Sequence, residues 1–385
     1  MSEVRSERFE SLDHWRGIAC LSVVIYHSTI VYLSSADETT LSTTLIGRLL
    51  SLSHQLNVGV ALFFVISGYC IAAAADSARR RNATVGEYFV RRFRRIYPPF
   101  WIVVAWSVAL FFVLDYGWSF PLLSSPPWAQ LRPWWYSPSQ WVGNLTLTET
   151  WRPYIFGSIR GHFPGQAWTL CYEEQFYFIT GMLLLFVRRR FFTGVALVSL
   201  ATFAISIVCR HWGIALNGWF FDGAWLLFAA GVGAYYGISH ATGLTRRAVE
   251  LGLIAAAAAS LYVDVPIFGA SVGFGFAAAL PWLHKADSRI SASVLLRPLF
   301  WCGRMCYSLY LVHQLPVKAV STALYRNGTT GAVSTLLLTV PLSVGVALAL
   351  GWAFHLLVER RFLNSPMRLS EAAPASPRSL AGALA

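Results

Sequence analysis

Residues 12–27 read LDHWRGIACLSVVIYH, and they open the first long apolar run of the chain, which extends from about residue 15 to residue 34. A helix of about 20 apolar residues is long enough to cross the hydrocarbon core of a bilayer. An ionisable side chain inside such a segment is costly and marks a candidate functional site. This run carries Arg16 near one end and His27 past its middle, so it predicts a membrane helix that contributes to a functional site.

The composition extends this interpretation to the whole chain. Of its 385 residues, 56% are hydrophobic and only 12% are charged, whereas an ordinary soluble domain carries about 25% charged residues. So few charges cannot cover a surface that faces water, which excludes a water-soluble globular enzyme and a disordered chain. The sequence therefore predicts an all-α polytopic membrane protein.

The apolar runs give the expected number of spans. They cover residues 15–34, 55–75, 97–114, 168–187, 191–208, 219–237, 247–263, 266–283, 298–321 and 333–357. We expect ten transmembrane helices that together form one membrane domain over residues 1–363. Residues 364–385 are rich in Ala, Pro and Ser and are predicted to be a disordered cytoplasmic tail.

Basic residues indicate how these spans are oriented. The net charge is +12, and arginine clusters such as those at 79–81 and 188–190 lie between apolar runs. Cytoplasmic loops carry the excess of Lys and Arg, which predicts that both termini are cytoplasmic. The clusters therefore indicate orientation in a bilayer, and no nucleic-acid partner is expected. The six cysteines have no zinc-ligand spacing, so no metal site is expected either.

Arg16 and His27 share one face of the first predicted helix. They are eleven residues apart, about three turns, which corresponds to about 16 Å along the axis. The predicted orientation places Arg16 at the cytoplasmic mouth and His27 toward the outer face. A single membrane histidine can also serve only as a hydrogen-bond partner for a neighbouring helix, and the sequence leaves that alternative open.

The fourth and ninth runs place more ionisable groups at a similar depth. Glu173 and Glu174 follow the outer end of the fourth run, and helical rise puts Glu173 roughly 8 Å below the outer boundary. The same arithmetic puts His27 roughly 12 Å below it. His313 lies in the outer half of the ninth run. Three separate segments thus predict a polar site within the membrane.

Arginines and small residues indicate what this site could accept. Arg92 and Arg95 are three residues apart, on one helical face at the predicted cytoplasmic side. They could clamp a phosphate, because guanidinium groups match phosphate oxygens, or they could simply be positive-inside charge. Ser67 and Gly68 in the second run could line a passage or let two helices approach closely.

The long outer segment, from about residue 115 to residue 167, is rich in tryptophan. Its indole side chains are those of Trp118, Trp128, Trp134, Trp135, Trp141 and Trp151. They could form an aromatic belt at the membrane interface or a platform on which sugar rings stack. The sequence does not choose between these two interpretations.

These motifs resemble acyltransferase family 3, bacterial membrane proteins that O-acylate carbohydrates. The resemblance covers roughly residues 9–362 and rests on five motifs in the family's order. They are Leu12-Asp13 with Arg16-Gly17 and His27, residues 62–68 (LFFVISG), Arg92 with Arg95-Ile96-Tyr97-Pro98, residues 168–177 (WTLCYEEQFY), and residues 307–313 (YSLYLVH). The chain departs from the usual pattern at His14-Trp15 and Cys171-Tyr172, and neither departure changes a polar residue of a motif.

The resemblance implies an O-acyltransferase of the bacterial cytoplasmic (inner) membrane. It implies an acyl-CoA co-substrate, usually acetyl-CoA, and no permanently bound cofactor. Arg92, Arg95 and Arg16 would hold the coenzyme A phosphates. The acceptor would be a carbohydrate hydroxyl, as in an exopolysaccharide, an O-antigen or a related glycan.

The same resemblance implies the catalytic residues, which are His27, Glu173 and Arg16. His27 would take the proton of the sugar hydroxyl, and Glu173 would orient His27 or raise its basicity. Alternatively, His27 would carry the acyl group transiently as an acyl-imidazole. Ser67, His313, Tyr307 and Trp168 would line the substrate pocket.

Two other functional classes compete with the enzyme. A multi-span transporter of a glycan or acyl metabolite would also place polar residues in its spans, although the sequence shows no internal repeat of the kind many transporters have. A non-catalytic scaffold would leave Arg16, His27 and Glu173 unexplained. Binding of coenzyme A distinguishes the enzyme from the transporter.

Overall fold

The computed structural model of the chain describes six stretches of sequence. They are residues 9–36, 38–113, 132–157, 159–214, 216–261 and 267–363. These stretches contain helices and loops and no strand, which confirms the predicted all-α class. The predicted disordered tail, residues 364–385, lies outside the described residues.

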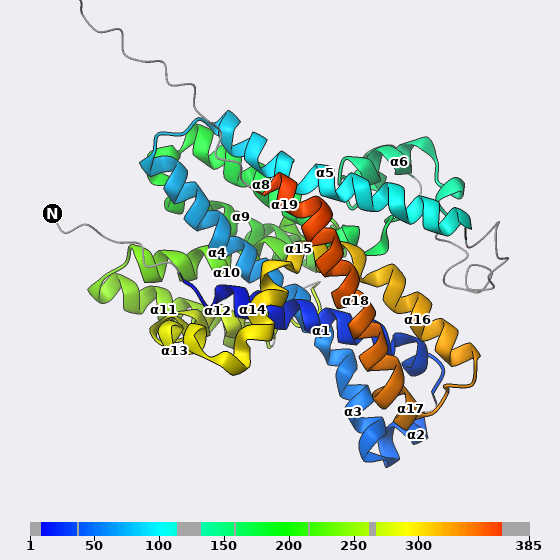
Figure 1. The fold of residues 1–385 in the computed structure, drawn as a ribbon. Coiled ribbons are helices and arrows are strands. Elements are labelled where there is room, and N and C mark those ends of the chain that lie inside the picture. The colour runs from blue at the N-terminus through cyan, green and yellow to red at the C-terminus, as the bar shows by residue number, and fades with distance from the viewer. Residues whose placement is uncertain are drawn as a thin grey trace, which may run out of the picture.

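Helices follow one another along the whole described chain (Figure 1). In the first half they are α1 (Leu12–Leu33), α2 (Glu38–Thr43), α3 (Leu45–Ser53), η1 (His54–Val58), α4 (Gly59–Arg80), α5 (Val85–Phe112), η5 (Pro133–Trp135), α6 (Pro138–Leu145), α7 (Arg152–Phe156), η6 (Gly165–Ala167), α8 (Trp168–Phe186) and η7 (Arg188–Arg190). In the second half they are α9 (Phe191–His211), η8 (Phe220–Asp222), α10 (Ala224–Ser239), α11 (Gly243–Ala259), α12 (Ala270–Lys285), α13 (Asp287–Ala292), η9 (Val294–Leu296), α14 (Arg297–Arg304), α15 (Cys306–Val312), α16 (Gln314–Arg326), α17 (Ala332–Ser334), η10 (Thr335–Thr339), α18 (Val340–Phe354), η11 (His355–Glu359) and α19 (Arg360–Phe362).

Every predicted apolar run coincides with one of these helices or with a broken series of them. Among the described residues, five helical segments are long and apolar enough to cross a membrane, which makes the chain a multi-pass membrane protein. They are Leu12–Leu33, Leu45–Arg80, Val85–Phe112, Arg188–His211 and Ala332–Phe362. The total of ten spans and the cytoplasmic side of both termini stay predictions.

The ninth run differs from the single helix that we predicted. It consists of α14, α15 and α16, with interruptions at Met305 and His313. Pro316 lies in the first turn of α16, where its missing N–H costs no helical hydrogen bond. A helix that ran unbroken through Pro316 would lose a bond and clash with the preceding turn, which explains the interruption at His313.

The third run extends further than its apolar residues indicated, because α5 begins at Val85 rather than near residue 97. Thr84 caps the helix by accepting a hydrogen bond from the backbone N–H of Glu87 at 3.2 Å. The basic stretch from residue 91 to residue 95 is therefore helical, as the predicted shared face of Arg92 and Arg95 requires.

Small residues allow α1 and α4 to pack closely against their neighbours near the centre of the molecule (Figure 1). A side chain on Gly17 of α1 would overlap the backbone of α14, and one on Gly303 of α14 would overlap the backbone of α1. Gly68 of α4 and Gly231 of α10 have the same relation. Gly68 therefore serves close helix approach, one of the two interpretations left open above.

The outer segment folds back along α5. α6 and α7 are joined by residues 146–151, and the tip of this turn contacts the middle of α5. Tyr97 donates to the backbone carbonyl of Thr146 at 3.1 Å, and Trp101 donates to that of Leu145 at 2.9 Å. We call residues 137–163 the returning segment.

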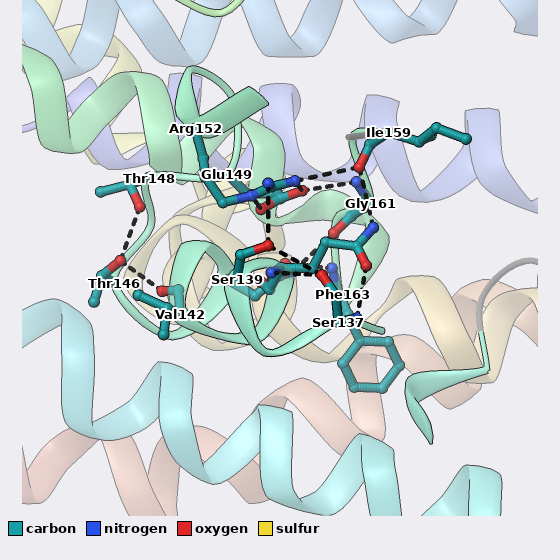
Figure 2. A network of polar contacts seen from close by, with 12 residues as sticks. Ser137, Ser139, Val142, Thr146, Thr148, Glu149, Arg152, Ile159, Gly161 and Phe163 are labelled. Atoms are coloured by element: carbon teal, nitrogen blue, oxygen red, sulfur yellow. Dashed lines mark hydrogen bonds and ion pairs between the residues drawn. The ribbon is translucent and has the colours of Figure 1, made fainter. Parts of the chain in front are cut away.

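A buried ion pair holds the returning segment together (Figure 2). Arg152 donates to both carboxylate oxygens of Glu149, at 2.6 and 2.9 Å, and both side chains are almost completely buried. Arg152 also donates to the Ser139 hydroxyl and to the backbone carbonyls of Gly157 and Ile159, and the Gly161 N–H donates to Glu149. Irregular backbone in a membrane protein is tolerated where such internal partners satisfy it.

Candidate active site

A central cavity of about 260 Å³ lies between α1, α4, α5, α8, α14 and α15. Predicted site residues from five separate segments line it: Arg16, Ser67, Arg92, Arg95, Glu173 and Tyr307. The structure therefore brings together most of the residues that the sequence singled out. His27, His313 and Trp168 are not part of this lining.

Arg16 is held at one end of the cavity by two neighbours. Its guanidinium group donates to the carboxylate of Asp13 at 2.6 Å and to the thiol sulfur of Cys70 at 2.8 Å. Asp13 lies one helical turn earlier on α1, so the pair fixes the guanidinium against its own helix. Arg16 therefore presents a positioned cation to the cavity.

Glu173 is the polar centre of the cavity. Its Oε1 atom accepts hydrogen bonds from the Ser67 hydroxyl at 2.6 Å and from the Tyr177 hydroxyl, which lies one turn further along α8. Arg92 stacks over the ring of Tyr177, with its guanidinium carbon 5.1 Å from the ring centroid. Ser67, Glu173, Tyr177 and Arg92 thus form one connected group from three helices.

A second cavity of about 280 Å³ adjoins the first and is rich in arginine. Arg81, Arg91, Arg92 and Arg95 line it, with Glu87 as a carboxylate among them. Cys70, Arg92, Arg95 and Leu363 line both cavities, so the two are adjacent. An arginine-lined cavity thus lies next to the cavity that holds Glu173.

His27 and His313 lie beside each other, as their predicted similar depth requires. Their ring centroids are 5.2 Å apart with an interplanar angle of 43°. His313 Nδ1 lies 2.8 Å from the backbone carbonyl of Tyr310, and this contact orients the ring. His313 Nε2 and His27 Nδ1 are buried and have no hydrogen-bond partner among the described residues.

Tyr310 separates the histidine pair from the central cavity. It lines the cavity, and its ring centroid lies 6.1 Å from that of His313. Its hydroxyl contacts Thr169 and the backbone carbonyl of Gln166, and Phe63 packs edge-on against its ring at 6.3 Å. The Tyr310 and Phe63 rings therefore form the end wall of the cavity on the histidine side.

Trp168 lies away from this group. Its ring packs edge-on against Tyr172, with centroids 6.1 Å apart. Tyr172 in turn donates to Asp222, the last residue of η8. The contacts of Trp168 thus connect α8 to η8, and its assignment to the substrate pocket stays a prediction.

The sequence interpretation missed several residues that line the cavity. Cys70 and Tyr310 are two of them, and buried Glu359 is a third, with contacts to the Ser308 hydroxyl and to His355 Nδ1. The sequence did contain a signal for Glu359. It follows His355 by four residues at the end of an apolar run, a spacing that places both side chains on one polar helix face. Cys70 had no such signal, since a cysteine in an apolar run is ordinarily a small core residue.

Metal ligation has no candidate in the part of the chain that the structure describes. No group of three or more His, Cys, Asp or Glu side chains there is placed to hold a metal ion. The side chains that line the central cavity carry carboxylate, hydroxyl and guanidinium groups.

Comparison with known proteins identifies a family. A family model described as an acyltransferase domain matches residues 9–356 of the chain. No curated protein matches, and no solved structure matches. The matched residues include all the residues that line the central cavity except Glu359 and Leu363.

Proposed function

The chain belongs to acyltransferase family 3, and from this premise we propose that it transfers an acyl group, such as acetyl, from acyl-CoA to a carbohydrate hydroxyl at the membrane. One observation carries the proposal. An arginine-lined cavity lies directly beside a cavity that holds a carboxylate and several hydroxyl groups, and the two share Arg92 and Arg95. Such a space suits a substrate with a polyanionic end and a reactive neutral end.

The phosphates of coenzyme A fit the arginine-lined cavity. Arg92 and Arg95 line both cavities, so they would hold phosphates at the junction between them. Arg16 lies further along the central cavity, where it would meet the polar pantetheine arm. The arm would extend toward Glu173 and place the thioester near Ser67 and Tyr177.

A proton acceptor is needed because a neutral hydroxyl attacks a thioester slowly. In the proposed reaction the hydroxyl oxygen bonds to the acyl carbon, the carbon–sulfur bond breaks, and the hydroxyl proton passes to His27. The thiolate of coenzyme A is the leaving group and is then protonated. An acyl-imidazole on His27 is the alternative route, in which the acyl group crosses to the acceptor in two steps.

The position of Tyr310 adds a requirement to this mechanism. The described cavity ends at Phe63 and Tyr310, and the histidine pair lies behind them. Either Tyr310 moves when the donor binds, or Glu173 mediates proton transfer through its hydroxyl partners. Glu173 would orient His27 only in the first route, in which Tyr310 moves.

The proposed place of the reaction is the bacterial cytoplasmic (inner) membrane, with acyl-CoA arriving from the cytoplasm. The arginine-lined cavity supports this, because basic residues gather on the cytoplasmic side of membrane proteins. The acceptor would be a glycan such as an exopolysaccharide or an O-antigen.

Binding of acetyl-CoA to the purified full-length protein in nanodiscs tests the donor site. We expect saturable binding by the wild type and about tenfold weaker binding by Arg95→Gln, because one hydrogen bond to a charged group is lost. Arg94→Gln is the matched control, since Arg94 is a neighbouring exposed arginine that lines neither cavity. Absence of coenzyme A binding by folded wild-type protein would favour the transporter.

A further inference from the structure

A third cavity lies on the flank of the molecule, between α5, α8 and the tip of the returning segment. Its volume is about 700 Å³, and Tyr97, Trp101, Trp151, Trp219 and Phe220 are among the aromatic residues that line it. Glu174 and Gln175 bring polar side chains to it from α8. A mostly apolar cavity with a few placed polar groups is the usual form of a ligand site.

The central and flanking cavities share a wall made of two side chains. Arg92 and Tyr177 line both cavities, and the two side chains stack on each other. Glu173 lines the central cavity, whereas its neighbour Glu174 lines the flanking one. Consecutive residues of a helix point about 100° apart, so α8 directs one carboxylate to each side of this wall.

The rim of the flanking cavity is apolar and exposed. Phe93 and Trp101 on α5 are 46% and 40% exposed, and Phe178 on α8 is 56% exposed. α5 is one of the candidate membrane spans, so the part of this apolar rim that it supplies is suited to contact with lipid chains. A ligand dissolved in the bilayer could reach the cavity across this rim.

These observations define an amphipathic ligand. Its apolar part would lie against Phe93, Trp101 and Phe178, and its polar part would reach Glu174, because the Gln175 amide already bonds to Cys171, Gly218 and Phe220. Stacked indole rings stand beside the polar part, because Trp151 lies parallel to Trp219 with centroids 5.3 Å apart. A hydrocarbon chain that carries a hydroxylated ring satisfies both surfaces.

We propose that the flanking cavity binds a glycolipid, and that this glycolipid is the acyl acceptor. This inference rests on the proposed function and specifies its acceptor as membrane-anchored. The sugar hydroxyl would approach the donor thioester across the wall formed by Arg92 and Tyr177. The hydroxyl oxygen bonds to the acyl carbon, the thioester carbon–sulfur bond breaks, and the hydroxyl proton finally resides on the coenzyme A thiol.

Photocrosslinking to the full-length protein in nanodiscs tests the binding site without any donor. The probe is dodecyl glucoside with a diazirine in its alkyl chain, and labelled residues are mapped by mass spectrometry. We expect labels on Phe93, Trp101 and Phe178 that excess dodecyl glucoside removes and excess phosphatidylglycerol does not. Labels displaced equally by phosphatidylglycerol would overturn the proposal, because the cavity would then hold bulk lipid.

Two variants that fill the cavity sharpen the test. Ile179→Trp places a large ring inside the cavity from α8, and Thr148→Trp does so from the returning segment. Each should reduce labelling at Phe178 at least fivefold, whereas Leu185→Trp, a lipid-exposed position of α8 outside the cavity, should leave it unchanged. Labelling unchanged in both filled variants contradicts the proposal.

Failure of this inference is separable from failure of the proposed function. Acetyl-CoA binding by the same samples reports the donor site, which the filled variants do not touch. A protein that binds acetyl-CoA but is not labelled in the flanking cavity remains an acyltransferase with an acceptor that arrives from water.

Discussion

At the scale of single residues, the hydrogen bonds of Glu173 organise the central cavity. A carboxylate inside a membrane domain needs donors, because a buried acceptor without a partner costs about 1–3 kcal/mol. Ser67 and Tyr177 supply two hydroxyl donors, and Ser67 comes from a helix more than a hundred residues earlier in the chain. The sequence placed Ser67 and Glu173 in one site but could not show that they bond directly.

Ser67→Ala tests the importance of this contact. Removing the hydroxyl takes one donor from Glu173, and we expect acyl transfer to fall about tenfold, which corresponds to about 1.4 kcal/mol. Initial rates of label transfer from acetyl-CoA measure the effect. Ser22→Ala serves as the control, because the Ser22 hydroxyl bonds to its own helix at the carbonyl of Ile18. Equal rates for wild type and Ser67→Ala would show that the contact is dispensable.

At the scale of elements, the returning segment depends on its internal ion pair. Glu149 and Arg152 are three residues apart and both almost fully buried, so neither can find water if its partner is lost. The sequence indicated a long aromatic outer loop in this region, with no sign of a compact segment closed by this pair. The bonds that close it join residues scattered over the loop and depend on its final backbone path.

Arg152→Leu should destabilise the protein strongly. The substitution leaves the Glu149 carboxylate buried and uncompensated, which costs about 3–5 kcal/mol. Thermal unfolding in detergent, followed by tryptophan fluorescence, should show a clearly lower midpoint than in the wild type. Arg160→Gln changes an exposed arginine of the same loop, which contacts the Asn217 carbonyl and the Tyr154 ring at the surface, and it should lower the midpoint much less than Arg152→Leu. If Arg152→Leu unfolds at the same midpoint as the wild type, the ion pair contributes little to stability.

His162 gives the returning segment a pH dependence. Burial, together with Arg160 and Arg152, lowers the pKa of His162 from 6.5 to about 4 in the folded protein. Above pH 6.5 the side chain is neutral in both states and has no effect. As the pH falls from 6.5 toward 4, only the unfolded chain binds the proton, so the free energy of unfolding decreases, by at most roughly 3 kcal/mol.

Comparing unfolding midpoints at pH 7.5 and pH 4.5 tests this effect. We expect His162→Gln to lose less stability between the two pH values than the wild type, because it has no imidazole to protonate. His211→Gln is the control, since His211 is exposed on α9. The same pH-dependent loss in wild type and His162→Gln would assign the acid sensitivity to other groups.

At the scale of the whole molecule, composition predicted the fold class and the motifs predicted most of the central cavity. Every apolar run is helical, and Arg16, Ser67, Arg92, Arg95, Glu173 and Tyr307 meet in one space. These predictions succeeded because apolar length and intramembrane charge are local properties of the sequence. Helix packing, in contrast, determines the wall at Tyr310, the position of Glu359 and the flanking cavity. Which helices pack together cannot be derived from the local properties of a single sequence.

The most direct test of the account follows an acetyl label from acetyl-CoA to the glycans of membranes that carry the protein. We predict that wild-type protein releases free coenzyme A and labels a glycan fraction, and that His27→Ala, shown to be folded and to bind acetyl-CoA, does neither. Labelling by His27→Ala at the wild-type rate would remove His27 from the mechanism. The contradicting result is that membranes with folded wild-type protein release no more coenzyme A and label no more glycan than membranes that lack the protein.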